Sequence, residues 1–530
     1  MQTEPKPTSP SHAVSADRPL WARTLLIGTR QTLPSLAAQL KASSKGIGFA
    51  GCLVVNESER DTRRAIEWPA GLSLAVLGDL TNLAEAHRVL GITAAVVSLP
   101  ESMASQRLKF TARLGELGVR TRFVQPIDDV LDESGAPMIR RSASDVSIVE
   151  LIGRVPFGID RRSVAQAITG KRVLITGAGG SIGSELARIC ATFSPSSLIL
   201  MERAENALFE IDRQIGTRFP GLLRRAVLHD ITDADRTRRL FEDLKPQVVF
   251  HAAAHKHVPL MEDHPAHAVT NNVFGTRSVA DASIAVRAER FVLVSTDKAV
   301  NPTSVMGATK RIAEMYVQSL GRAGRECPTR CAIVRFGNVL GSACSVVPIW
   351  ASQLAEGGPI TVTDPRMTRY FMTIHEAATL VVQSAAATAT TGEAPVYVLD
   401  MGEPVKILDL ATRFVRAHGF APTLPGKTPI PGDQAPIEIA FSGARPGEKL
   451  HEELAYADEQ LQSTPNPGIR AWRGCLDPNL DIQSMITELD RVRHDSSGTE
   501  VIETIAAYVP ELAERRTQSY QIKKDFEAAA

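Results

Sequence analysis

The stretch Lys171-Arg-Val-Leu-Ile-Thr-Gly-Ala-Gly-Gly-Ser-Ile-Gly183 decides the fold of this chain. Its first six residues are typical of a buried strand, and a helical pattern begins at Ser181. Three glycines spaced three residues apart lie in this turn: Gly177, Gly180 and Gly183. Such glycines allow a tight bend, a close approach of the backbone to a pyrophosphate and close packing of helix on strand. The N–H groups of the first helical turn, at Ser181 and Ile182, then face the phosphates, so the stretch predicts a dinucleotide-binding loop.

The next predicted strand, Ser197–Met201, leads directly into Glu202. An acid at this place binds the adenosine ribose hydroxyls and disfavours a 2′-phosphate, so we expect NAD rather than NADP. Arg203 keeps the alternative open, because an arginine can accept that phosphate, and Glu202 can also be a solvated or helix-capping acid. After the following strand, Asp230 and Ile231 are expected to contact the adenine.

Strand and helix patterns alternate over two successive regions, which predicts parallel sheets with helices on both faces. In the first region the expected strands are Arg23–Gly28, Gly51–Val55, Leu74–Leu77, Ala94–Val97 and Arg122–Val124, with helices at Pro34–Leu40 and Thr81–Leu90. In the second they are Lys171–Thr176, Ser197–Met201, Val248–His251, Phe291–Ser295, Cys331–Phe336 and Val396–Leu399. We therefore predict an α/β fold: a Rossmann-type doubly wound parallel sheet with a smaller substrate-binding lobe, preceded by a second Rossmann-like domain.

The expected domain boundaries follow these patterns. Residues 1–20 are rich in Pro, Ser and Thr and are predicted to be disordered. We then expect a Rossmann-like domain at 21–132, a linker at 133–170 with a short helix at Arg161–Ile168, the main domain at 171–475, and a helical extension at 476–530. The turn after the first strand, Gly28-Thr-Arg-Gln-Thr-Leu33, lacks the later glycines of a dinucleotide loop, which favours a structural or regulatory domain over a second nucleotide site.

Composition excludes several classes of function. The 59 Lys and Arg residues balance the 59 Asp and Glu residues, so charge gives no argument for nucleic acid or an anionic membrane. No apolar run approaches the ~18–20 residues that span a bilayer, and no secretory signal is visible, so we expect a cytoplasmic protein without an integral membrane segment. The six cysteines are dispersed. Cys327 and Cys331 have no second ligand pair nearby, and the five histidines between positions 251 and 267 are not fixed by loop spacing, so we expect no metal.

The stretch Ser295–Lys310 (S-T-D-K-A-V-N-P-T-S-V-M-G-A-T-K) is the predicted centre of the chemistry. Met306 and Lys310 are four residues apart and share one face of a helix. A thioether neither gives nor takes a proton near pH 7. Acid–base work must then lie elsewhere, and the adjacent Asp297 and Lys298 are the predicted place.

Residues from about 150 to 460 resemble the nucleoside-diphosphate-sugar 4,6-dehydratases of bacterial polysaccharide biosynthesis, which are extended short-chain dehydrogenases/reductases. The matching segments are T-G-A-G-G-S-I-G-S-E (176–185), H-A-A-A-H-K-H-V-P (251–259), 295–310, R-F-G-N-V-L-G-S (335–342), M-T-R-Y-F-M (367–372) and R-P-G-E-K-L (445–450). The resemblance implies conversion of UDP-N-acetylglucosamine to a 4-keto-6-deoxy product for polysaccharide or lipopolysaccharide biosynthesis. It also implies a bound NAD that takes hydride from C4 and returns it to C6, while water is lost across C5 and C6.

The resemblance assigns roles to the catalytic stretch. Thr296 would contact O4, Lys298 would take the C5 proton, and Asp297 would protonate the 6-hydroxyl. Lys310 would hold the nicotinamide ribose, and Met306 would pack near the ring. The reaction then needs a neutral amine beside a protonated acid. We expect desolvation by the bound sugar to favour both, and the positive charges of NAD+ and Lys310 to lower the pKa of Lys298 further.

The remaining motifs imply binding roles. Ala252 and Ala253 are expected beside the NAD, and Asn272 is expected to brace the active-site helices. The substrate side is assigned to Lys256, His257, Asn338, Arg369, Arg445 and Glu448, of which the two arginines and Asn338 would meet the UDP phosphates and Glu448 the uridine ribose. Cys344 stands where the family commonly has glycine, so we expect an altered loop conformation there.

Three alternatives stay open. A sugar-nucleotide 4-epimerase shares the NAD loop, but it normally needs the tyrosine that Met306 replaces. A non-catalytic, NAD-sensing regulator would have no use for Asp297 and Lys298. A dehydratase that inverts C5 cannot be separated from one that retains it. Because the superfamily commonly pairs through helices of the nucleotide domain, we expect a homo-oligomer, whereas the transmembrane helices of long family members are not transferred to this chain.

Overall fold

The protein is described by a computed structural model that covers residues 24–43, 49–55, 66, 68, 73–99, 103, 110, 113–124, 157–322, 328–387, 394–425, 436–474, 479–494 and 497–514. The predicted disordered segment 1–20 and Cys327 lie outside these ranges. The chain divides into two compact units: residues 1–155 with 416–420, and residues 156–415 with 421–530.

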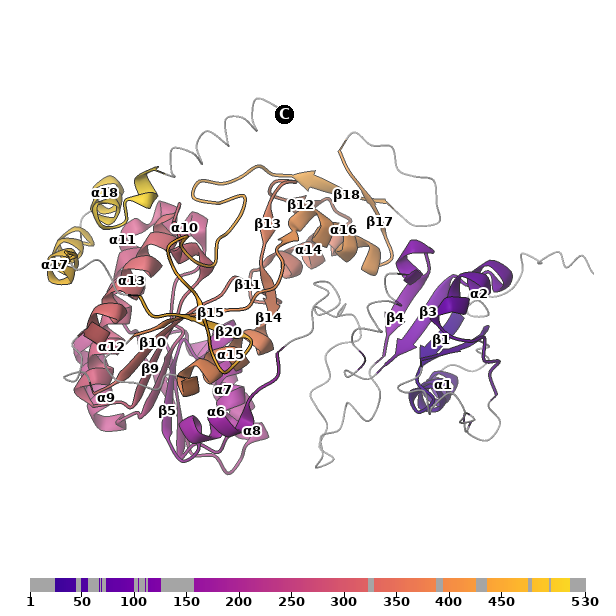
Figure 1. The fold of residues 1–530 in the computed structure, drawn as a ribbon, viewed down its shortest axis with the longest axis horizontal. Helices are drawn as coiled ribbons and strands as arrows, with labels where there is room; N and C mark the ends of the chain where they lie inside the picture. Colours follow the sequence, from indigo (N-terminus) through magenta and orange to yellow (C-terminus); the bar gives the residue numbers. More distant parts are fainter. Residues whose placement is uncertain are drawn as a thin grey trace, which may run out of the picture. The chain divides into compact units, whose positions relative to one another are not determined.

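The described strands of the first unit form a parallel sheet (Figure 1). Its order is β2 (Gly51–Val54), β1 (Thr24–Gly28), β3 (Ala94–Ser98) and β4 (Arg120–Phe123). Helix α1 (Thr32–Ser43), the short helix η3 (Leu80–Asn82) and helix α2 (Leu83–Leu90) connect these strands. The predicted strand Leu74–Leu77 is wrong: this segment pairs with β2 at one isolated bridge, Cys52 to Val76. Val76 is half exposed at the sheet edge, whereas Leu74 and Leu77 are partly buried and pack against the apolar cores of this unit.

Nine described strands of the second unit form one sheet with a doubly wound order. From edge to edge the order is β19 (Gln462–Ser463), β20 (Ile469–Trp472), β15 (Val396–Leu399), β10 (Arg330–Arg335), β9 (Arg290–Val294), β8 (Val248–His251), β5 (Arg172–Thr176), β6 (Ser197–Glu202) and β7 (Arg224–Leu228). The seven strands from β15 to β7 are parallel, whereas β20 and β19 pair antiparallel. The predicted parallel Rossmann-type sheet is confirmed.

Helices cover both faces of this sheet, and each face has its own apolar core (Figure 1). One face carries α6 (Arg161–Ile168), α7 (Ser181–Ala191), α8 (Glu205–Arg218) and α15 (Ile374–Ala387). The other carries α9 (Ala234–Leu244), α12 (Gly275–Ala285) and α13 (Val305–Arg322). Helix α6 was predicted inside a linker at 133–170, but its apolar face belongs to the core of the second unit.

Short elements lie in the connections beyond these strands, and their short strands form separate small sheets. They are α10 (Val258–Asp263), α11 (Pro265–Ala268), the π-helix η5 (Val269–Phe274), the 3-10 turn η6 (Asp297–Ala299), β11 (Asn338–Leu340), α14 (Val346–Ala355), β12 (Ile360–Val362), β13 (Thr368–Arg369), β14 (Phe371–Thr373), β16 (Val405–Lys406), α16 (Ile407–Ala417), β17 (Ala421–Thr423) and β18 (Pro436–Phe441).

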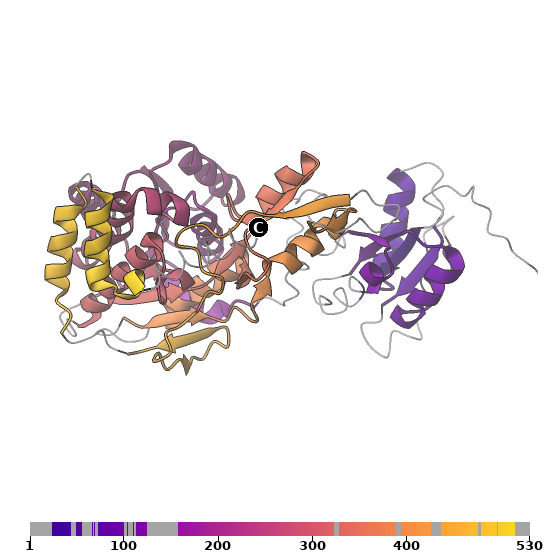
Figure 2. The same ribbon diagram turned by 90° about the horizontal axis from the view of Figure 1, so that it is seen from above.

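The C-terminal helices α17 (Ile482–Val492) and α18 (Gly498–Tyr508) lie side by side (Figure 2). Their apolar residues join the same core as α13, so the described part of the predicted C-terminal extension packs onto the main unit. Among the described residues, no helix has the length and apolar character needed to cross a membrane.

Candidate active site

The glycine loop lies at the carboxyl ends of β5 and β8, where the strand order reverses. Gly177 has a φ of 64°, and a Cβ on it would lie 2.8 Å from the backbone nitrogen of Ala253 and 2.9 Å from the carbonyl of Ala252. A Cβ on Gly183 would lie 2.0 Å from the oxygen of Gly177. The loop therefore forms a cradle of bare backbone that side chains would fill, at the crevice where doubly wound sheets bind nucleotides. These residues fit a dinucleotide pyrophosphate.

Glu202 ends β6 beside this cradle. Its carboxylate accepts hydrogen bonds from the backbone N–H groups of Gly179 at 3.2 Å, Arg203 at 2.9 Å and Ala204 at 3.0 Å. Arg203 faces Asp230, with Nη1 3.7 Å from Oδ2. The same Nη1 donates to Asn271 at 3.5 Å, so the arginine that could have accepted a 2′-phosphate already has acidic and amide partners.

Ile231, the other predicted adenine contact, is buried in the core behind Asp230, and its Cδ1 would be 2.7 Å from a Cβ on Gly275. Its side chain therefore packs against α12, where glycine leaves the room that it needs.

The catalytic stretch places its polar residues at the end of β9. The hydroxyl of Thr296 donates to Asp297 Oδ1 at 2.9 Å, and Lys298 Nζ donates to the same oxygen at 3.0 Å. Lys298 also donates to Asn338 Oδ1 at 3.2 Å. Asp297 is fully buried and its backbone N–H is held by the carbonyl of Phe336 on the neighbouring strand. The acid and the amine are thus adjacent in space as well as in sequence.

Helix α13 follows this turn and presents Met306 and Lys310. Lys310 Nζ donates to the carbonyl of Val294 at 2.8 Å, at the end of β9. Burial lowers the pKa of Lys310 to about 8, against the opposing charge of Glu314. Met306 is 3% exposed and packs in the apolar core. Met306 therefore contributes packing at the start of α13 and neither donates nor accepts a proton.

Asn272 ties the helices of this region together, as predicted. Its Oδ1 accepts from the N–H of His255 at 2.8 Å, and its Nδ2 donates to the carbonyl of the same residue at 3.2 Å. Nδ2 also donates to Thr309 Oγ1 on α13 at 3.2 Å. The bracing role predicted for Asn272 is confirmed.

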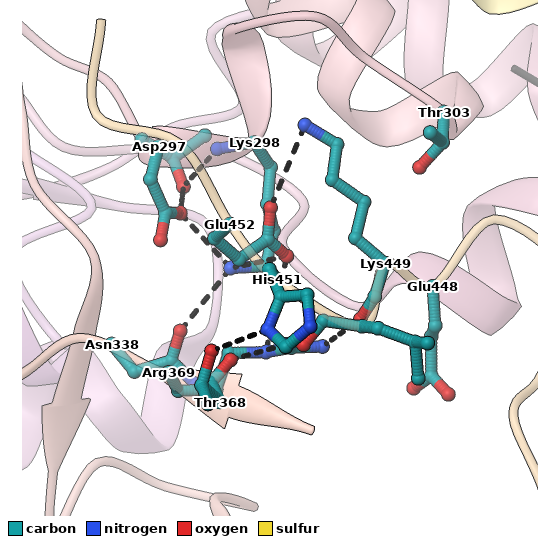
Figure 3. Close-up of polar contacts among 12 residues, drawn as sticks. Asp297, Lys298, Thr303, Asn338, Thr368, Arg369, Glu448, Lys449, His451 and Glu452 are labelled. Atoms are coloured by element: carbon teal, nitrogen blue, oxygen red, sulfur yellow. Dashed lines mark hydrogen bonds and ion pairs between the residues drawn. The ribbon is translucent and has the colours of Figure 1, made fainter. Parts of the chain in front are cut away.

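One pocket collects the residues predicted to bind substrate. It is lined by Lys256, His257, Asn338, Arg369, Arg445 and Glu448, together with Lys298, Thr303, Lys449 and Glu452 among others (Figure 3). Lys298 therefore faces the same space as the six predicted residues. Five segments that lie far apart in the sequence contribute to this lining: the loop after β8, the catalytic turn, strand β11, strand β13, and the segment from Arg445.

The arginines of the pocket are already engaged. Arg369 donates to the carbonyls of Thr368 at 2.7 Å, Leu450 at 3.1 Å and Lys449 at 2.8 Å, so it braces the segment that follows Arg445. Arg445 pairs with Glu448, with Nη2 2.9 Å from Oε1. The prediction that these side chains meet the UDP remains a prediction, and binding would require them to share or exchange these partners.

Two carboxyl groups of the protein itself act on the pKa of Lys298. Burial alone lowers the pKa of this amine, but the charges of Asp297 and Glu452 outweigh burial and raise it above its ordinary value. Glu452 Oε1 lies 3.6 Å from Lys298 Nζ, and its side chain is 3% exposed. Sequence reasoning missed this second carboxylate. The run His451-Glu-Glu453 contains two adjacent glutamates, and the sequence alone does not show which of the two side chains points toward Lys298.

The loop containing Cys344 bridges the two halves of the site. Ala343 donates its N–H to Ser181 Oγ at 3.1 Å and accepts from Lys256 Nζ at 2.9 Å. Cys344 is exposed and has a φ of 56°, a left-handed conformation that favours glycine. The loop thus keeps the conformation that a glycine would take, despite its side chain.

Among the described residues, no group of three or more His, Cys, Asp or Glu side chains is arranged to hold a metal. His251 illustrates why the histidine-rich loop does not form such a group. Its two ring nitrogens contact the hydroxyls of Thr176 at 2.7 Å and Thr276 at 3.0 Å. Burial, with the charge of Lys310, lowers the pKa of His251 to about 3, so the ring is a neutral bridge between β8 and α12.

Fold and site together define a Rossmann-type α/β protein in which a glycine cradle and the ion pair of Asp297 and Lys298 share one edge of the sheet. The family model described as "Polysaccharide biosynthesis protein" matches residues 173–473. The chain belongs to this family.

Individual relatives agree with this assignment. A probable polysaccharide biosynthesis protein, EpsC, of Bacillus subtilis is 42% identical over 390 residues, which cover 73% of this chain and 62% of the relative. The match thus spans about three fifths of that protein. A UDP-N-acetylglucosamine 4,6-dehydratase (inverting) of Campylobacter jejuni is 32% identical over 54% of this chain and 78% of its own length. The X-ray structure of Pen from Bacillus thuringiensis superposes with a TM-score of 0.52 at 28% identity, covering 62% of this chain and 99% of that chain.

Proposed function

We propose that this protein is a 4,6-dehydratase of UDP-N-acetylglucosamine that acts in polysaccharide biosynthesis and binds NAD in the glycine cradle. The observation that carries the proposal is the pair of buried Asp297 and partly buried Lys298 at the end of β9. Family membership and the Campylobacter relative support the substrate class. When bound, NAD would supply the hydride acceptor for C4 and the hydride donor for C6.

The residues of this chain would divide the work around that chemistry. Gly177 and Gly183 leave room for the pyrophosphate, and Glu202 offers its carboxylate to the adenosine ribose. Lys310, on α13, would hold the nicotinamide ribose, and its amine lies at the end of β9. Thr296 would orient O4, as its hydroxyl is already fixed by Asp297.

Proton transfers at C5 and at the 6-hydroxyl would fall to the buried pair. Burial, together with the charge of Glu452, raises the pKa of Asp297 against the opposing charge of Lys298, which suits a group that must give a proton to the departing hydroxyl. Lys298 lines the pocket and would take the C5 proton once its amine is neutral. Each assignment is the one that the family resemblance implies, and the two groups titrate as one coupled system.

A 4-epimerase is the rival reaction, since it also oxidises C4. It normally relies on an acid–base group at the position of Met306, which here is a buried thioether. It would gain nothing from a protonated acid beside a base at C5 and C6. The residue pair therefore favours dehydration.

The test is an assay of the purified full-length protein with UDP-N-acetylglucosamine in heavy water. We expect a 4-keto-6-deoxy sugar nucleotide with deuterium at C5, identified by mass spectrometry and NMR, which also read the C5 configuration. Lys298→Ala and Asp297→Asn should each lower kcat by ~10²-fold or more, because each removes a proton-transfer group. The exposed Lys406→Ala is the matched control and should keep wild-type activity. A product changed only at C4, or full activity of Lys298→Ala, would overturn the proposal.

A further inference from the structure

Glu452 lies inside a cluster of positive groups that no solvent reaches freely. Its Oε1 is 3.6 Å from Lys298 Nζ and 3.9 Å from Arg369 Nε, and its Oε2 is 3.8 Å from Lys449 Nζ (Figure 3). The three cations come from the catalytic turn η6, from β13 and from the segment of Glu452 itself. Within the described part of the chain, Oε2 has no hydrogen-bond partner. Oε2 of Glu452 is therefore held by the charge of Lys449 and not by a hydrogen bond.

Asp297 lies on the opposite side of Lys298. Its Oδ1 accepts from both Thr296 and Lys298, whereas its Oδ2 is buried and has no hydrogen-bond partner among the described residues. A buried, unpartnered oxygen is unfavourable for a charged carboxylate and favourable for a carboxylic acid. One cation thus lies between two carboxyl groups that occupy very different surroundings. Two carboxyl groups that share a site do not both ionise readily.

We propose that Glu452 is the resident counter-ion of Lys298, and that by pairing with this lysine it leaves Asp297 free to carry the proton that the reaction requires. Glu452 is in this view a positioning residue, because it acts through Lys298 and Asp297. The inference rests on the proposed dehydratase function for its catalytic consequence. The arrangement of charges itself does not depend on that function.

The charged surroundings of each group agree with this division. Burial raises the pKa of Glu452, but Lys298, Arg369 and Lys449 outweigh burial and lower it, so Glu452 stays ionised. Burial raises the pKa of Asp297, and the charge of Glu452 adds to burial against the opposing effect of Lys298. A further titratable neighbour is Tyr370 beside β13, whose raised pKa, due to burial and then to Glu403, Asp297 and Glu453, keeps its hydroxyl neutral.

The variant Glu452→Gln tests this inference, because glutamine keeps the size of the side chain and removes its charge. Asp297 then becomes the remaining carboxylate partner of Lys298, and the pKa values of both groups fall. Asp297 therefore loses its proton at a lower pH, and the amine of Lys298 becomes neutral at a lower pH. The whole profile of kcat against pH should move to lower pH. At a fixed pH on its alkaline side, kcat should fall about tenfold for each pH unit by which the profile moves, while KM changes by less than ~3-fold.

Two further variants make the test specific. Glu452→Asp keeps the charge and should return the profile toward that of the wild type. Glu453→Gln removes a charge at the next position, where the side chain bonds to Asn301 at 2.7 Å and is 40% exposed, and should leave the profile in place. A loss of kcat in Glu452→Gln that is equal at every pH, or a profile that does not move, would overturn the inference.

A second measurement separates this inference from the proposed function. Infrared difference spectra between the wild type and Asp297→Asn report the carbonyl band of a protonated carboxyl group without any turnover. We expect this band at neutral pH in the wild type, and we expect it to disappear at a lower pH in the Glu452→Gln background. If the wild type makes no 4-keto product but the band behaves as described, the dehydratase proposal falls and the role of Glu452 stands. If the band is absent from an active wild type, the inference falls alone.

Discussion

Met306 is a residue of the candidate site that cannot transfer a proton. A buried thioether at this position leaves Lys310 in place and removes one proton carrier from α13. In the proposed reaction, proton transfer depends on the short turn that precedes the helix, where Asp297 and Lys298 are adjacent. Sequence alone could identify that pair, because the two residues are neighbours in the chain. It could not identify Glu452, which reaches them only after the segment from Arg445 has folded across the turn.

Gly307 fixes the distance between that turn and α13. A Cβ at this position would lie 2.2 Å from the backbone oxygen of Lys298 and 3.2 Å from Pro302 Cβ. Gly307→Ala must therefore push the catalytic turn away from the helix, and a displacement of about 1 Å costs ~10²-fold in kcat. Steady-state kinetics with UDP-N-acetylglucosamine measure this effect. Gly115→Ala is the control, since a Cβ there meets no atom within 4 Å, and it should be active. Unchanged kcat in Gly307→Ala would contradict the tight packing of helix on turn.

At the scale of elements, the parallel strands gather the site at one edge of the sheet. The ends of β5, β8, β9 and β10 bring the glycine cradle, the loop 252–257, the catalytic turn and Asn338 together. The central strands were predictable because continuous apolar runs are typical of strands that are buried on both faces. β20 was not, because its burial alternates and it pairs antiparallel with both β15 and the edge strand β19. Leu74–Leu77 was predicted as a full strand because it is apolar, but it pairs with β2 only through one bridge at the sheet edge.

Asn272 is the element-scale connection that can be tested. It is fully buried in the π-helix η5 and joins this helix to the loop after β8 and to α13. Asn272→Ala leaves the N–H and the carbonyl of His255 without this partner, which should lower the free energy of unfolding by about 3 kcal/mol. Urea denaturation followed by circular dichroism measures the change. The exposed Asn206→Ala should stay within ~0.5 kcal/mol of the wild type. Equal stability of the two variants would show that the bracing contributes little.

At the scale of the whole second unit, a buried ionic cluster joins helix, sheet and the C-terminal segment behind the site. Arg335 on β10 donates to Glu314 on α13 at 2.8 and 2.7 Å and to Glu459 at 2.9 and 2.7 Å. Ser295, at the end of β9, donates to the same Glu314 at 2.7 Å. The residues that hold the catalytic turn are thus linked to the segment that carries Glu452. No local pattern in the sequence predicts this link, because Arg335, Glu314 and Glu459 lie on separate segments of the chain.

This cluster predicts a specific sensitivity to acid. Burial raises the pKa of Glu314, but Arg335 outweighs burial and holds it below its ordinary value of 4.5. A carboxylate with a lowered folded pKa contributes stability above its unfolded pKa, and this contribution is lost as the pH falls through the folded pKa. Glu314→Gln should therefore lower the free energy of unfolding by about 3 kcal/mol at neutral pH, with a smaller difference below about pH 4.

Denaturation with urea at several pH values measures this difference against a matched control. Glu242→Gln removes an exposed carboxylate on α9 that lies 3.2 Å from Arg238, and the pair is about half exposed. An exposed pair of this kind contributes less than ~1 kcal/mol, so the control should follow the wild type at every pH. If Glu314→Gln also follows the wild type, the cluster is not what holds β10 to α13. If its deficit stays constant down to acid pH, the lost interaction is one of packing and not of charge.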